Sequence, residues 1–177
     1  MAVTAKDEIF AVGDSTSKDL DMYNFVKKSS HLITADKSDG IIVKYDCKGN
    51  VIWKKIFGGS GRESFRDILF NGDIIMTIGT SDSIDGDLTY LVDMGLKKKW
   101  NETCDDIVIV IYNNNGEIIW KTLLSGKSFD RPFSVVQIGE DSYIIVGSTS
   151  SEDGDFSCFN KGLDDAFIIK LHVHNCK

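Results

Sequence analysis

The sequence is poor in proline, histidine and cysteine, with one, three and four of these residues in 177. A single proline and sixteen glycines exclude a collagen-like or proline-rich chain. Basic side chains are outnumbered by acidic ones, 20 to 27, and the net charge of −7 argues against nucleic acid and anionic membranes as partners. No apolar run reaches the roughly 20 residues that span a bilayer, so no membrane insertion is expected. The 42% hydrophobic content suffices for one domain with a buried core.

The N-terminus and the cysteines bear on the compartment. Residues 1–8 lack the basic and then apolar layout of a secretory signal. The chain as it stands is therefore expected to be cytoplasmic, whereas removal of a signal would make it a cell-surface or secreted protein. Cys47, Cys104, Cys158 and Cys176 form no C-x-x-C pair and no zinc-type cluster with histidine. We expect reduced thiols, with a Cys104–Cys158 disulfide as the alternative.

A unit of about 66 residues repeats along the chain. The segments 39–46 and 49–55 recur as 106–113 and 116–122, and a third copy of the first segment starts at Asp165. The segments 78–81 and 85–87 recur in the same way as 146–149 and 153–155. The chain therefore contains nearly three copies of one unit. Trp53 and Trp120 occupy the same position in successive units, which predicts that they pack between units.

Each unit has the pattern of β-strands and turns. Runs of four to eight residues rich in Ile, Val, Phe and Tyr are separated by clusters of Gly, Asn, Asp and Ser. The middle unit predicts strands at about 64–70, 73–80, 106–113 and 117–124. Tight hairpin turns are expected at 47–50 and 113–116, because Asn and Gly adopt positive φ at little cost. The best helical candidate, 20–31, is interpreted as a loop or a single turn. A repeated four-stranded unit of this length is typical of a β-propeller blade.

At the segments 49–60 and 153–170 the chain resembles the bacterial β-propeller repeat often abbreviated SBBP. The resemblance covers nearly the whole chain and implies a propeller with a binding or scaffolding role. The family has no shared catalytic residues, so none is carried over. The expected fold is all-β and of the β-propeller type, with about three imperfect four-stranded blades in one domain of residues 1–177. The blades are expected at about 1–57, 64–124 and 132–172, the last without its outer strand. A β-sandwich is the alternative.

The candidate ligand-binding residues lie in loops. In a propeller, the connections between the second and third strands and those between successive blades open on one face. The former are long here, at 15–38, 81–104 and 150–164, and long loops on a rigid scaffold tend to carry binding residues. Trp100 beside Lys99 suits a sugar ring or a protein partner, with capping of its own loop as the alternative. Arg62 and Arg131 lie in the connections between blades, where they either bind one anion or pair with Glu63 and Asp130.

No residue is predicted to be catalytic, because no Ser-His-Asp or Cys-His arrangement can be argued from sequence order, and no cofactor is expected. The carboxylates of 85–87 and 153–155 could bind Ca²⁺, but the EF-hand pattern is absent and a turn role is preferred. The expected function is a non-enzymatic binding or assembly module that recognises a protein or carbohydrate through the long-loop face. The alternative is a glycan-active hydrolase or lyase with acidic residues at the central channel.

The incomplete third blade predicts assembly. Free strand edges template pairing with other chains, and propellers avoid them by closing a ring of typically about 4–8 blades. Three blades fall short of a ring, whereas two copies would supply six, and dimers are the commonest oligomers. We therefore expect a homodimer that completes a six-bladed ring, with the N-terminal segment of the partner supplying the missing outer strand. The alternative is an open monomer or a fragment of a longer array.

Overall fold

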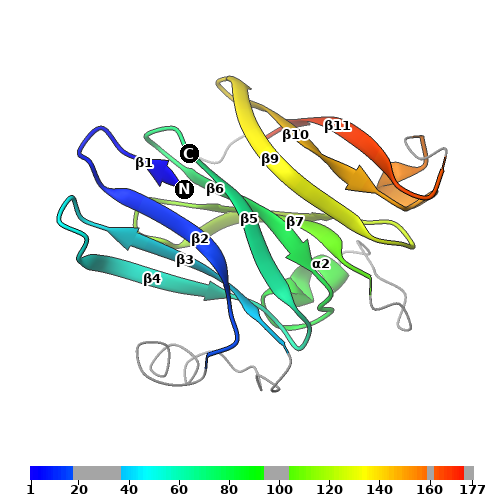
Figure 1. The fold of residues 1–177 in the computed structure, drawn as a ribbon, viewed down its shortest axis with the longest axis horizontal. Coiled ribbons are helices and arrows are strands. Elements are labelled where there is room, and N and C mark those ends of the chain that lie inside the picture. The colour runs from blue at the N-terminus through cyan, green and yellow to red at the C-terminus, as the bar shows by residue number, and fades with distance from the viewer. Residues whose placement is uncertain (18–36, 94–103, 159–161, 174–177) are drawn as a thin grey trace.

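The computed structural model describes residues 1–17, 37–93, 104–158 and 162–173, which form three antiparallel sheets (Figure 1). The first sheet consists of β1 (Ala2–Val3), β2 (Ile9–Ser15), β3 (Asp39–Tyr45) and β4 (Val51–Phe57). The second consists of β5 (Glu63–Phe70), β6 (Ile75–Ser81), β7 (Asp106–Tyr112) and β8 (Ile118–Leu124). The third consists of β9 (Asp130–Gly139), β10 (Ser142–Thr149) and β11 (Asp165–His172). In each sheet, strands that follow one another in sequence are hydrogen-bonded neighbours.

The second sheet lies between the other two and buries both of its faces (Figure 1). Every residue of β6 and β7 is buried. Successive side chains of a strand point to opposite faces. Val108 and Val110 therefore join the hydrophobic cluster shared with the first sheet, whereas Ile107 and Ile109 join the cluster shared with the third. This two-sided burial explains why β7 reads as a continuous apolar run.

The two hydrophobic clusters repeat one packing arrangement at equivalent positions. Phe10 and Ile42 of the first sheet pack against the second sheet. Their equivalents in the repeat, Met76 and Ile109 of the second sheet, pack against the third. We call the face of a sheet that carries these residues its forward face, and the opposite face its backward face. Each forward face in the interior of the structure thus packs on the backward face of the next sheet.

The hairpin turns follow the predicted chemistry. In the β7–β8 turn, Asn113 Oδ1 accepts hydrogen bonds from the backbone N–H groups of Asn115 and Glu117, at 2.9 and 3.0 Å. Gly116 has a φ of 72°, in the left-handed region that favours glycine. In the β3–β4 turn, Asp46 Oδ1 accepts two backbone hydrogen bonds in the same way as Asn113. The turns expected at 47–50 and 113–116 are therefore confirmed.

The two repeated tryptophans lie between sheets, as the repeat predicts. The Trp53 ring on β4 lies 5.9 Å from the ring of Phe10, and its Nε1–H donates to the carbonyl of Asn114 in the second sheet at 3.2 Å. Trp120 on β8 packs against the cluster between the second and third sheets. Each tryptophan therefore adds apolar surface to the forward face of its own sheet, at the fourth strand.

The all-β class and the strands of the middle unit agree with the sequence-based expectation. The third sheet ends at β11 and has no fourth strand among the described residues. The described strands form three sheets rather than the two of a sandwich, and no sheet closes on itself. Cys158 is a free thiol, so the alternative Cys104–Cys158 disulfide is not formed.

One helix lies where the sequence predicts only loop. The 3-10 turn η2 (Gly86–Leu88) and the helix α2 (Thr89–Asp93) follow β6. Leu88 and Leu91, 0% and 2% exposed, anchor them in the cluster between the first two sheets. Five helical residues are too few to give a recognisable apolar period, which explains why the sequence misses α2. The candidate segment 20–31 lies outside the described residues. None of the described helices has the length and apolar character needed to cross a membrane.

The burial of the second sheet predicts a matched pair of isoleucine substitutions. Ile109, 0% exposed between the second and third sheets, should cost about 2–5 kcal/mol of unfolding free energy when changed to alanine, because a cavity replaces it. Ile52 on β4 is 48% exposed, and Ile52→Ala should cost less than about 1 kcal/mol. Denaturant titration of both variants measures the difference, and equal costs would contradict the two-sided burial.

Candidate functional site

The connection between β4 and β5 is held by side chains from the connection that follows β6. The backbone N–H groups of Gly58, Ser60 and Gly61 donate to Asp87 Oδ2, Asp85 Oδ1 and Ser83 Oγ, at 2.9, 2.6 and 2.6 Å. We call this set of contacts, between residues 58–62 and 82–87, the first loop bracket. It satisfies backbone donors that would otherwise lack acceptors where two sheets meet.

The same arrangement recurs between the second and third sheets. The backbone N–H groups of Ser125, Lys127 and Ser128 donate to Asp155 Oδ2, Asp153 Oδ1 and Ser151 Oγ, at 2.8, 2.8 and 3.0 Å. This second loop bracket joins residues 125–129 to 150–155. The aspartates of 85–87 and 153–155 thus accept backbone hydrogen bonds, which is the turn role expected of them. In the described part of the chain, no group of three or more His, Cys, Asp or Glu side chains is placed to hold a metal ion.

A carboxylate is buried at the centre of each loop bracket. Glu63, 1% exposed, accepts a hydrogen bond from Ser81 Oγ at 2.6 Å. Asp130, 0% exposed, accepts from Thr149 Oγ1 at 2.5 Å and from Ser151 Oγ at 3.0 Å. Burial raises the pKa of both carboxyl groups above the ordinary value, although the hydrogen bonds oppose the shift. The sequence signal for these groups is an acidic residue followed 18 or 19 residues later by a hydroxyl residue, Ser81 after Glu63 and Thr149 after Asp130.

Carboxyl groups with a raised pKa are candidates for acid–base catalysis, so the access to these two matters. Both oxygens of Glu63 accept protein hydrogen bonds, one from Ser81 and one from the N–H of Gly59. Both oxygens of Asp130 are engaged in the same way. A general acid or base must reach the proton that it transfers, and neither side chain has exposed surface with which to do so. Glu63 and Asp130 therefore hold loops together in this structure.

Two of the four predicted ligand-binding residues lie in the described part of the chain, and both arginines are partly exposed. Arg62 Nε lies 3.5 Å from the carboxylate of Asp82, with 60% of the arginine side chain exposed. Arg131 Nε lies 3.8 Å from the carboxylate of Asp105, and its guanidinium lies 5.1 Å from the centre of the Phe129 ring. Each arginine therefore already has an acidic partner.

The predicted pairing of Arg62 with Glu63 and of Arg131 with Asp130 is wrong, because both carboxylates point into the loop brackets. The two arginines also differ in repeat position, since Arg131 is the second residue of β9 whereas Arg62 precedes β5. Trp100 and Lys99 lie outside the described residues. The two described arginines thus each lie beside a different carboxylate, Asp82 or Asp105.

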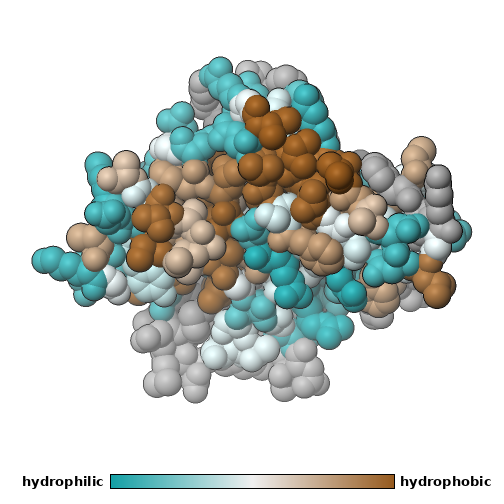
Figure 2. Space-filling model, turned by 45° about the horizontal axis from the view of Figure 1, so that its top comes forward, coloured by the Kyte–Doolittle hydropathy of each residue, from teal (hydrophilic) through white to brown (hydrophobic). Residues whose placement is uncertain are grey.

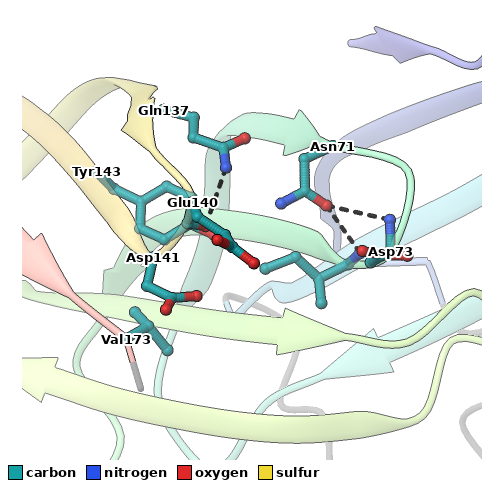
Figure 3. A pocket seen from close by; sticks show the side chains of 8 residues that line it. Asn71, Asp73, Gln137, Glu140, Asp141, Tyr143 and Val173 are labelled. Carbon is teal, nitrogen blue, oxygen red and sulfur yellow. Dashed lines mark hydrogen bonds between the residues drawn. The ribbon is translucent and has the colours of Figure 1, made fainter. Parts of the chain in front are cut away.

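A polar cleft of about 210 Å³ lies at the opposite end of the strands, between the β5–β6 and β9–β10 turns (Figure 3). Its lining includes Asn71, Asp73, Gln137, Glu140 and Asp141. Asn71 Oδ1 accepts the backbone N–H groups of Asp73 and Ile74, at 3.1 and 3.0 Å, and Gln137 Nε2 donates to nearby backbone carbonyls. The two amides thus stabilise their own turns, and the cleft presents no built ligand site.

A more apolar groove of about 570 Å³ lies between α2 and β8. Tyr90 and Ile119 line it and are 64% and 41% exposed. Lys121 also lines the groove, but its Nζ donates to the carbonyl of Asp87, which ties the lysine to the first loop bracket. The groove therefore offers apolar surface with few groups to orient a ligand.

The forward face of the third sheet is exposed and apolar. Phe133, Val136 and Ile168 are 62%, 53% and 67% exposed, and Ile144 and Val146 of the same face are half-buried. Figure 2 shows a continuous hydrophobic patch in its upper half, on the side of the molecule where the third sheet lies in Figure 1. The other two forward faces are covered by a neighbouring sheet. This face is the strongest candidate for a binding surface among the described residues.

Comparison of the sequence with protein-family models and with curated proteins finds no match. The resemblance of 49–60 and 153–170 to the SBBP repeat stays a prediction.

The second loop bracket predicts the effect of adding one methyl group. A Cβ atom at Gly126 would lie 2.2 Å from Ser151 Cβ, whereas a Cβ at Gly13 would have no neighbour within 4 Å. Gly126→Ala should therefore lower the free energy of unfolding by about 1–3 kcal/mol through overpacking, while Gly13→Ala should change it little. Denaturation of the two variants in parallel measures this. If they were equally stable, the bracket would not constrain the loop.

The buried Glu63 predicts a pH dependence of stability. Its pKa is higher in the folded chain than in the unfolded one, so the stability that it contributes is full below the unfolded pKa and is lost as the pH rises through the folded pKa. Relative to Glu63→Gln, the wild type should therefore become less stable as the pH rises from about 4 to about 7. Thermal denaturation across this range measures the difference, with the exposed Glu152→Gln as the matched control. An unchanged difference would contradict the assignment.

Proposed function

We propose that this chain is a non-enzymatic assembly module of the β-propeller type. In this proposal, the forward face of the third sheet packs on the backward face of the first sheet of a second copy. Two such contacts would relate two chains by a two-fold axis and place six sheets in a ring, which falls within the usual range of about 4–8 blades.

The observation that carries the proposal is the exposed apolar face of the third sheet. Ile168 is 67% exposed, but its equivalents Ile42 and Ile109 are both 0% exposed, because a following sheet covers them. Val136 is 53% exposed, and its equivalent Leu69 packs against the cluster between the second and third sheets. The third sheet thus keeps the apolar residues of a covered face, which supports a partner sheet at this position.

The backward face of the first sheet has the matching residue pattern, with Val43 buried and Ile41 and Tyr45 half-buried in the single chain. Ile41, Val43 and Tyr45 occupy its backward face, at the positions where Val108, Val110 and Tyr112 receive the first sheet within the chain. Within one chain, forward faces already pack on backward faces twice. A second copy therefore provides, for the forward face of the third sheet, the kind of backward face on which the other two forward faces pack.

Recognition of a protein or carbohydrate through the long-loop face, by Trp100 and Lys99, stays a prediction. The described loop groups favour the sheet face instead, because the loop amides and acids bind one another in the loop brackets. The alternative of a glycan-active hydrolase or lyase likewise stays a prediction.

The mass of the protein in solution tests the proposed dimer. Light scattering coupled to size exclusion should give about twice the chain mass of 19.7 kDa at micromolar concentration. Val136→Asp places a charge in the proposed contact, so it should give the mass of one chain with little change in unfolding temperature.

Leu163→Asp is the matched control, because Leu163 is 95% exposed and lies in the connection before β11 rather than on the face. It should leave the mass unchanged. A wild-type mass of one chain would refute the proposal, and so would a dimer that Val136→Asp leaves intact.

A further inference from the structure

The edge of β11 opposite β10, from Ala166 to Leu171, is a second incomplete surface, distinct from the forward face. We call it the free edge, because no strand of the described residues lies along it. In the first two sheets, the third strand is paired on both sides: β3 with β2 and β4, and β7 with β6 and β8. β11 occupies the same place in the third sheet and pairs with β10 over eight residues, from Asp165 to His172. No strand of the described residues lies along its other edge. A row of backbone groups at a sheet edge is a template for a further strand.

The core beside this edge is less covered than in the second sheet. Ile169 and Leu171 of β11 are half-buried, whereas their equivalents Val110 and Tyr112 on β7 are 0% and 1% exposed. In the second sheet, the fourth strand contributes to this cover, since Leu123 of β8 is 4% exposed and belongs to the same cluster. A fourth strand along β11 would therefore bury apolar surface as well as pair the backbone.

The residues of β11 indicate which kind of strand fits. In the first sheet, Trp53 lies across from Lys44, and Phe57 lies across from the small residue Gly40. In the second sheet, the equivalent Trp120 and Leu124 lie across from two isoleucines, Ile111 and Ile107. β11 has Lys170 and Ala166 at these positions, so it matches the first sheet rather than the second.

We propose that the free edge of β11 binds an extended segment of another chain with the residue pattern of β4. The segment pairs antiparallel to β11, its tryptophan lies across from Lys170, and its terminal phenylalanine lies across from Ala166. The backbone hydrogen bonds supply affinity, and the alternating side chains supply specificity. In β4, Trp53, Lys55 and Phe57 lie on one face of the strand, so the segment presents two aromatic rings and a lysine on the same side.

The N-terminal segment of a second copy, which the sequence suggests as the donor, is already paired within its own sheet. Ala2 and Val3 form β1, where they pair with Phe10 and Ile9 of β2. Ala2 also packs against the cluster between the first two sheets. Releasing this segment would open the first sheet, which favours a different donor, and the N-terminal donor stays a prediction.

Peptide binding tests the proposal. A fluorescently labelled peptide of residues 50–57 is titrated into the whole chain and compared with its scrambled sequence and with a peptide of residues 117–124. We expect saturable binding of the first peptide, at least about tenfold tighter than that of the scrambled one. Its binding should also be several-fold tighter than that of the 117–124 peptide, because the 117–124 strand pairs with isoleucines in its own sheet and β11 has none at these positions. Hydrogen exchange should slow at the amides of β11.

Equal binding of the scrambled or the 117–124 peptide would overturn the proposal. So would slower hydrogen exchange at the groove between α2 and β8 in place of β11. The proposal does not depend on the dimer. The titration is therefore repeated with Val136→Asp, whose substitution lies on β9 at the other edge of the sheet. A monomeric wild-type chain that binds the peptide would sustain the edge and refute the dimer. A dimeric wild-type chain that fails to bind the peptide, both as the dimer and as the monomeric Val136→Asp variant, would do the reverse.

Discussion

The burial of both faces of the second sheet is the constraint on which the rest of the structure depends. Each fully buried Val or Ile stabilises a fold by about 1.5–3 kcal/mol relative to exposure, and all seven residues of β7 are buried. Because alternate residues of β7 serve opposite clusters, the two clusters share one backbone. A register shift of one residue would exchange their side chains, so the packing of either outer sheet fixes the register for the other.

The loop brackets follow from this stacking. A chain that passes from one sheet to the next must turn where the sheets are close, and those of its amides that are buried there, such as the N–H groups of Gly59 and Gly61, need acceptors from protein. The aspartates and serines after β6 and β10 supply these acceptors, at the cost of burying Glu63 and Asp130. Hydrogen bonds to all four carboxylate oxygens offset that cost. A satisfied polar network of this kind admits one arrangement of the loops, which makes the spacing between sheets specific.

The strands could be predicted from the sequence, because side chains alternate over a few residues and the repeat shows the same pattern in successive units. The predicted strands at 106–113 and 117–124 differ from β7 and β8 by one residue at one end. The contacts of the loops depend instead on residues about twenty apart in sequence, such as Arg62 and Asp82. Glu63 is adjacent to Arg62 in sequence, and for that reason the sequence suggested the wrong acidic partner. The exposed face of the third sheet could not be predicted either. Ile168 and the buried Ile109 both lie three residues after the aspartate that begins their strand, and only the number of stacked sheets distinguishes them.

The exposed face and the free edge of the third sheet are coupled by their position. In the first two sheets, the tryptophan of the fourth strand joins the same cluster as the forward residues of the third strand, as Trp53 does with Ile42. A strand added to β11 would therefore widen the forward face by one strand and bring a tryptophan onto it. Packing of a partner sheet on the wider face would in turn cover the added strand. Each event then favours the other by the same free energy, since such coupling is reciprocal. The stacking of sheets that fixes the interior therefore also favours the proposed assembly at the third sheet, whose forward face is uncovered.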